Sequence, residues 1–251
     1  MLHGRVDTEG FGFEPCIDDV ESLNHAALRG THRLSKLSFH AYLHLAGRYL
    51  LLDAGSALGY GCGPLVVARG SLAGLEGARV AIPGELTTAY LLFRLWNEAD
   101  VDIHVARFDE ILEGVASGRF DAGLIIHEGR FVYPRHGLEK IIDLGEWWEA
   151  ETGLPIPLGC IAMRLEGGED ETTRAATFSG IIRASVRHAF DHPEDSRDFI
   201  RAHAREMDDD VTRRHIELYV NDFTLDLGDT GRRAILTLGE MARCRGILEP
   251  V

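Results

Sequence analysis

The fold class is decided by the stretch RFDAGLIIHEGRF, at residues 119–131. Within it, residues 122–126 form a short apolar run bounded by Gly118 and Gly129, which predicts a buried strand of a parallel sheet. His127 follows directly. Ligands of open α/β sheets bind beyond the carboxyl ends of the strands, so the pattern predicts a titratable imidazole at a ligand site. The alternative is a structural histidine that ends the strand and bonds a nearby carbonyl.

Composition argues against two classes of partner. The chain has 251 residues and a formal net charge of -14, whereas binding of nucleic acid phosphates needs a basic patch. No apolar run approaches the roughly 20 residues of a transmembrane helix, and residues 1–7 lack the apolar core of a signal peptide. We therefore expect no nucleic acid or membrane partner and a cytoplasmic location.

No metal or cofactor is expected. The cysteines at positions 16, 62, 160 and 244 are far apart, which argues against a disulfide framework or a zinc site. His40 and His44 have the i, i+4 spacing that suits a metal, but no obvious third ligand accompanies them. The glycine-rich residues 59–63 precede a strand rather than a helix, so they fail the test of a dinucleotide loop. A loop that passes close to a ligand or to another backbone is the better interpretation.

A second candidate ligand site begins a predicted helix over residues 87–96. The helix follows a predicted strand over residues 79–82 and a Pro-Gly loop, and Thr87 or Thr88 is its N-cap. Free N–H groups and the positive end of the helix dipole would both face a ligand there. The sequence therefore predicts either a carboxylate or phosphate site or ordinary capping by one threonine.

A third candidate site lies where a predicted strand over residues 33–38 meets a predicted helix over residues 39–45. Lys36 and Ser38 stand at this junction, which is another position in the crevice beyond the strand ends, where ligands bind. A solvated lysine and a simple N-cap serine are the alternative.

The order of the predicted elements indicates an α/β protein with two lobes. Strands and helices alternate through the middle of the chain, while residues from 172 onward are helical and need a sheet elsewhere to pack on. We expect a first lobe of residues 1–70 plus 168–251 and a second lobe of residues 71–167. The chain would cross near residues 65–70 and 158–164, which gives a two-strand hinge and a ligand cleft between the lobes.

Several segments, in the same order along nearly the whole chain, resemble the 1,4-dihydroxy-6-naphthoate synthase family of the futalosine route to menaquinone. They are SKLSFHAY at 35–42, GCGPLVVAR at 61–69, PGELTTAYLL at 83–92, GLIIHEGRF at 123–131 and GLPIPLG at 153–159. The resemblance implies the two-lobed fold of type II periplasmic binding proteins. It also implies cleavage of a small-molecule substrate, cyclic dehypoxanthine futalosine, to 1,4-dihydroxy-6-naphthoate by a carbon–carbon lyase.

Carried over residue by residue, the resemblance implies that His127 is the catalytic base. It implies substrate contacts from two segments, one at the strand-to-helix junction and one at the helix start: Lys36, Leu37, Ser38, Thr88 and Ala89, with Thr87 adjoining. Family members normally begin with a further strand and a segment like Ser-Pro-Cys-Pro-Asn-Asp-Thr ahead of residues 3–6. We therefore expect either that the true start lies upstream or that this form lacks a strand of the first lobe and one wall of the pocket.

Two other functions fit the same pattern. One is a binding protein without chemistry for a small carboxylate, because the same fold serves that role widely. The other is chorismate dehydratase, a sister enzyme of the pathway, although His127 after Leu-Ile-Ile favours the naphthoate synthase. The sequence leaves the oligomeric state open, with a homodimer among the options.

Overall fold

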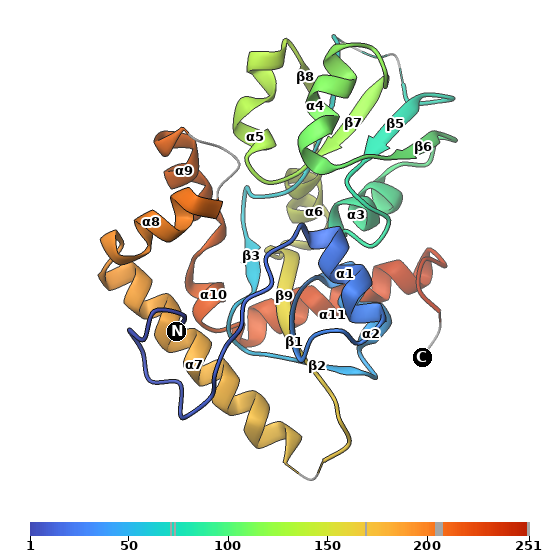
Figure 1. The fold of residues 1–251 in the computed structure, drawn as a ribbon. Helices are drawn as coiled ribbons and strands as arrows, with labels where there is room; N and C mark the ends of the chain where they lie inside the picture. The colour runs from blue at the N-terminus through green and yellow to red at the C-terminus, as the bar shows by residue number, and fades with distance from the viewer. Residues whose placement is uncertain (71, 73, 169, 204–207, 250–251) are drawn as a thin grey trace.

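Two β-sheets carry the fold in the computed structural model, which describes residues 1–70, 72, 74–168, 170–203 and 208–249 (Figure 1). In the first sheet the long strand β9 pairs antiparallel with three shorter strands. Its strands are β1 (Leu34–Ser38), β2 (Tyr49–Leu51), β3 (Ala57–Gly59) and β9 (Ile156–Arg164). The second sheet has the order β6-β5-β7-β4-β8. Its strands are β4 (Leu65–Ala68), β5 (Arg79–Ile82), β6 (Asp102–Val105), β7 (Ala122–Ile125) and β8 (Glu139–Asp143).

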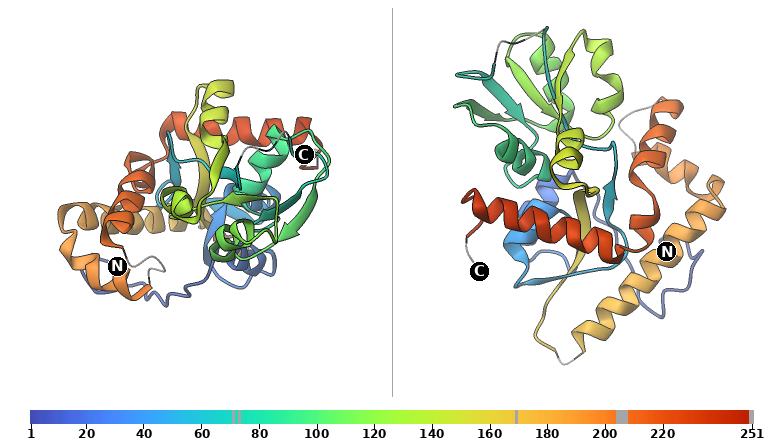
Figure 2. Two further views of the ribbon diagram at one scale, coloured as in Figure 1. Left: turned by 90° about the horizontal axis from the view of Figure 1, so that it is seen from above. Right: turned by 180° about the vertical axis from the view of Figure 1, so that it is seen from behind.

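Helices surround both sheets, as the three views show (Figures 1 and 2). Those before β9 are α1 (Val20–Leu28), α2 (Phe39–Leu45), α3 (Thr88–Trp96), α4 (Phe108–Ala116), α5 (Gly129–Val132), the 3₁₀ turn Tyr133–His136 and α6 (Leu144–Thr152). Those after it are α7 (Glu171–Asp191), α8 (Glu194–His203), α9 (Asp209–Tyr219), α10 (Asp222–Leu225) and α11 (Gly228–Cys244). In the described part of the chain, each helix is too short or too polar to cross a membrane.

The predicted strand ahead of His127 is β7, and all four of its residues are buried. Its pairing is mixed, since β7 runs parallel to β5 but antiparallel to β4. The sequence predicts a parallel sheet, and that holds for β5, β6 and β7. The difference arises because β4 enters this sheet from the first sheet and runs in the opposite direction.

The lobe boundaries expected at residues 70/71 and 167/168 need a correction. β4 belongs to the second sheet, where it pairs with β7 and β8, and β9 belongs to the first sheet over its whole length. The chain therefore passes between the sheets before β4 and before β9, rather than at residues 65–70 and 158–164. An apolar strand pattern reveals a buried strand but does not reveal which of two sheets it joins.

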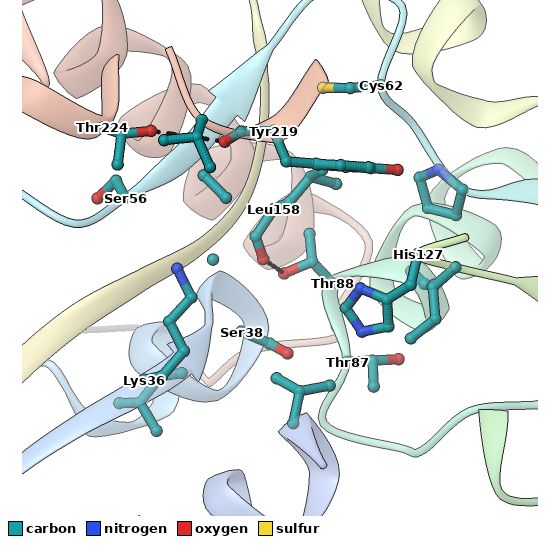
Figure 3. A pocket seen from close by; sticks show the side chains of 18 of the residues that line it. Lys36, Ser38, Ser56, Cys62, Thr87, Thr88, His127, Leu158, Tyr219 and Thr224 are labelled. Atoms are coloured by element: carbon teal, nitrogen blue, oxygen red, sulfur yellow. Dashed lines mark hydrogen bonds between the residues drawn. The ribbon is translucent and has the colours of Figure 1, made fainter. Parts of the chain in front are cut away.

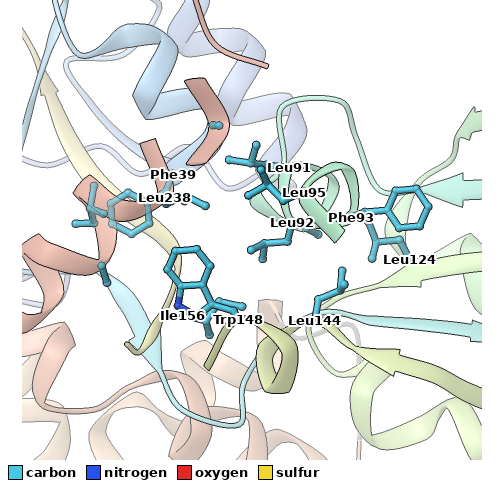
Figure 4. Packing of buried hydrophobic residues seen from close by; sticks show 14 of the residues in the cluster. Phe39, Leu91, Leu92, Phe93, Leu95, Leu124, Leu144, Trp148, Ile156 and Leu238 are labelled. Carbon is cyan, nitrogen blue, oxygen red and sulfur yellow. The ribbon is translucent and has the colours of Figure 1, made fainter. Parts of the chain in front are cut away.

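One apolar cluster joins the two sheets (Figure 4). Trp148 of α6 is fully buried in it, and its indole N–H donates to the carbonyl of Pro155 at 3.1 Å. Leu91 and Leu92 of α3 lie in the same cluster, which extends to Ile156 of β9. This packing fixes α3 and α6 between the sheets, where the candidate site lies.

Candidate active site

A cavity of about 280 Å³ lies between the two sheets (Figure 3). The structure brings all the residues that the sequence predicts as catalytic or substrate-binding to its wall. They are Lys36, Leu37 and Ser38 from β1, Thr87, Thr88 and Ala89 from the start of α3, and His127 from the end of β7. Three β-to-α junctions that are far apart in the sequence therefore face one space.

His127 has a backbone conformation that is uncommon for its residue type. Its φ is +54°, in the left-handed region, where residues other than glycine are rare and often belong to functional sites. The imidazole packs edge-on against Phe108, with 5.3 Å between ring centroids, and nearly parallel to His215 at 5.9 Å. Burial, and then the neighbouring His215 and Lys36, lower the pKa of His127 to about 4. The ring is therefore neutral at pH 7 and available to accept a proton.

The start of α3 offers amides rather than hydroxyls. Thr87 is the N-cap: its hydroxyl donates to the Gly84 carbonyl at 2.8 Å and accepts from the Tyr90 amide at 3.2 Å. The Thr88 hydroxyl donates to the Leu158 carbonyl at 2.7 Å. Among the described residues, no acceptor lies within hydrogen-bond reach of the Thr88 and Ala89 amides. Both amides stand at the positive end of the helix dipole, which suits an anionic oxygen.

The β1 junction combines a cation with a fixed serine. The Lys36 ammonium donates to the Gly55 carbonyl at 3.0 Å, and the lysine lines the cavity as an exposed residue. Ser38 occupies the N-cap position of α2, yet its hydroxyl makes no capping hydrogen bond. Asn24 instead holds both the Ser38 amide, at 3.0 Å, and the Ser38 hydroxyl, at 3.2 Å. The simple N-cap alternative is therefore wrong for Ser38.

The glycine-rich loop does both things that its sequence suggests. A Cβ atom on Gly63 would lie 2.2 Å from the Gly145 amide nitrogen, so the loop can approach the start of α6 only with glycine there. Cys62 and Pro64 line the cavity. Burial raises the pKa of the Cys62 thiol to about 12, so it stays protonated and unreactive.

Sequence reasoning missed the contribution of α9. His215 and Tyr219 stand four residues apart on one face of that helix, and both line the cavity. Their rings are 4.6 Å apart, and the His215 Nδ1 atom lies 3.9 Å from the Glu128 carboxylate. Burial lowers the pKa of His215 and raises the pKa of Tyr219. The i, i+4 spacing was visible in the sequence, but the charged residues around it are typical of a surface helix.

His40 and His44, the pair with metal spacing, approach each other at 3.4 Å between their Nε2 atoms. Burial is the main reason that the pKa of His40 falls to about 4. Within residues 1–70, 72, 74–168, 170–203 and 208–249, no three metal-ligating side chains come together.

Comparisons with known proteins show which family this chain belongs to. A family model described as menaquinone biosynthesis matches residues 1–244. The 1,4-dihydroxy-6-naphtoate synthase of Thermus thermophilus is 50% identical over 250 residues, which cover 100% of this chain and 90% of the relative. The chain belongs to the 1,4-dihydroxy-6-naphthoate synthase family. As a member of this family it is an enzyme of menaquinone biosynthesis, which argues against a binding protein without chemistry and against chorismate dehydratase.

Solved structures support the same fold for this family member. A protein from Archaeoglobus fulgidus superposes with a TM-score of 0.91 at 35% identity, covering 98% of this chain and 91% of that one. A Candida albicans protein described as having the generic periplasmic binding protein fold gives a TM-score of 0.60 at 10% identity, covering 92% and 78%. The α/β fold of periplasmic binding proteins is thereby confirmed.

Proposed function

We propose that this enzyme cleaves cyclic dehypoxanthine futalosine to 1,4-dihydroxy-6-naphthoate and that His127 is the general base. The observation that carries the proposal is the juxtaposition, on one cavity, of a neutral imidazole and the free amides of Thr88 and Ala89. The first group can accept a proton, and the second can bind an anionic oxygen of the same substrate.

The chemistry follows a retro-aldol course. His127 takes the proton of a substrate hydroxyl, the neighbouring carbon–carbon bond breaks, and the electron pair moves toward a carbonyl oxygen of the ring system. Formation of the aromatic naphthalene supplies the driving force. No hydride moves, so the reaction needs a positioned base and hydrogen-bond donors rather than an electron carrier.

An assay for the product tests the proposal directly. We expect the protein, incubated with cyclic dehypoxanthine futalosine, to produce the absorbance of a dihydroxynaphthoate together with the released sugar-derived fragment. The same protein with chorismate should give no dehydration product. Tight binding of a naphthoate without turnover of the cyclic substrate would instead identify a binding protein. The cytoplasmic location, the small-molecule substrate as partner and the oligomeric state remain predictions.

Replacing Thr88 with valine should weaken substrate binding. The Thr88 hydroxyl joins α3 to β9 through the Leu158 carbonyl and accepts from the His40 amide at 3.3 Å, so valine leaves both groups unpaired beside the free amides. We expect KM to rise about 10-fold, the equivalent of roughly 1.4 kcal/mol, with a smaller change in kcat. Ser196→Ala is the control, because it removes a hydroxyl-to-carbonyl bond of 3.1 Å at the surface. Equal KM values for Thr88→Val and the parent would remove this anion site from the proposal.

A further inference from the structure

Tyr219 presents a phenol to the cavity that the proposed chemistry has not used. Its ring extends along the cavity wall, and its hydroxyl end lies on the side where His127 stands (Figure 3). No described residue gives this hydroxyl a hydrogen-bond partner. Burial raises the pKa of Tyr219, so the phenol keeps its proton at neutral pH and can act as a donor.

The proposed reaction needs a donor at a second atom. While His127 removes a proton from the substrate hydroxyl, the electron pair of the broken bond collects on a carbonyl oxygen, which becomes a naphthol oxygen. A preorganised donor aimed at such an oxygen is usually a large contribution to catalysis. The Thr87 and Thr88 hydroxyls cannot serve, since they already donate to the Gly84 and Leu158 carbonyls.

We propose that the Tyr219 hydroxyl donates a hydrogen bond to this carbonyl oxygen and stabilises the developing enolate. The inference rests on the proposed function. The step balances: His127 holds the hydroxyl proton as an imidazolium, the oxygen facing Tyr219 takes the electron pair, and the imidazolium or water then returns one proton to that oxygen.

Contacts with the second lobe fix α9 in the position that this role requires. The Arg214 guanidinium lies 4.6 Å from the centroid of the Phe131 ring, which belongs to α5. Arg135 forms an ion pair of 3.2 Å with Asp208, the N-cap of α9. The centroid of the His215 ring lies 5.9 Å from that of His127 and 4.6 Å from that of Tyr219. These contacts hold Tyr219 on the wall of the cavity that His127 also lines.

Tyr219→Phe tests the inference, because it removes the hydroxyl and keeps the ring. We expect kcat to fall by about 10- to 100-fold, with KM and the melting temperature nearly unchanged. The matched control is Tyr133→Phe, because Tyr133 is also half-buried but does not line this cavity. If the wild type makes naphthoate and Tyr219→Phe has the same kcat, the role of Tyr219 is overturned and the proposed function is left intact.

A binding measurement gives an answer that does not depend on turnover. The probe is 1-hydroxy-6-naphthoate, whose naphthol can be titrated by absorbance when bound. A hydrogen bond to the charged oxygen favours ionisation, so the bound probe should have a lower pKa in the wild type than in Tyr219→Phe, by about one unit. Equal probe pKa values in the two proteins, with tight binding in both, would show that the hydroxyl does not reach this oxygen and would overturn the inference.

Discussion

Replacing His127 with alanine is expected to lower kcat by roughly 100-fold or more while substrate affinity and fold are kept, because a positioned base contributes on that scale. The residue has a φ of +54°, which alanine tolerates poorly, so a second variant is needed. His127→Asn is better matched, since asparagine adopts the left-handed conformation more readily and carries no base. We would measure kcat, the melting temperature and the binding of 1-hydroxy-6-naphthoate in both variants. A low kcat with an unchanged melting temperature and unchanged binding shows loss of the base rather than loss of the fold.

The pH dependence of the wild type checks the same role. The pKa of His127 is lowered from an ordinary value near 6.5 to about 4, so the base loses its lone pair only in acid. We expect kcat/KM to stay nearly constant from about pH 8 to about pH 5 and to fall as the pH drops through about 4. An acidic limb centred near the ordinary histidine value would contradict this environment for the base.

His104→Ala is the control for the histidine variants. His104 lies on β6 outside the cavity, its side chain is partly exposed to solvent, and its Nε2 atom pairs with Asp102 at 2.9 Å. Its loss should leave turnover within twofold of the wild type. Wild-type turnover in His127→Asn would exclude His127 as the base and direct attention to His215, the other imidazole on the cavity wall.

Local sequence patterns predicted the parts of the site that are fixed by a strand end or a helix start. An apolar run with a following histidine places His127 beyond β7, and a Pro-Gly loop with two threonines places the free amides of Thr88 and Ala89. Short-range geometry decides these positions, since a strand end and a first helical turn have few conformations. The same logic located Lys36 and Ser38 at the end of β1.

Tertiary placement decided what the sequence could not show. The pairing of β4 with β7 and β8 depends on the whole second sheet, so the observed boundary between the lobes differs from the one expected at residues 70/71. The sequence could not show where the Thr88 hydroxyl points, because its acceptor, the Leu158 carbonyl, lies 70 positions away and only the folded chain brings it near. The rings of α9 reach the cavity because that helix docks on the second lobe, a contact between residues about 80 positions apart in sequence.

Replacing Asp143 with alanine is expected to destabilise the fold by about 3–5 kcal/mol, the usual cost of leaving one member of a buried ion pair alone. The Asp143 side chain is 1% exposed, and its carboxylate meets the Arg130 guanidinium at 2.5 Å. Its other oxygen accepts from the Gly145 and Glu146 amides and caps α6. Arg130 also donates to the Gly63 carbonyl at 2.7 Å, so this one network holds the glycine-rich loop against the cavity.

Asp121 supplies the matched comparison for this effect. It pairs with Arg79 through two hydrogen bonds of 2.9 and 3.0 Å between side chains, but the two side chains are 32% and 44% exposed. Water and salt screen such a pair, so Asp121→Ala should cost only about 0–1 kcal/mol. Urea unfolding of both variants measures the difference. Similar losses of unfolding free energy in the two variants would mean that solvent reaches Asp143 as freely as Asp121. We also expect Asp143→Ala to bind 1-hydroxy-6-naphthoate more weakly, because Cys62 and Pro64 line the cavity from the loop that Arg130 holds.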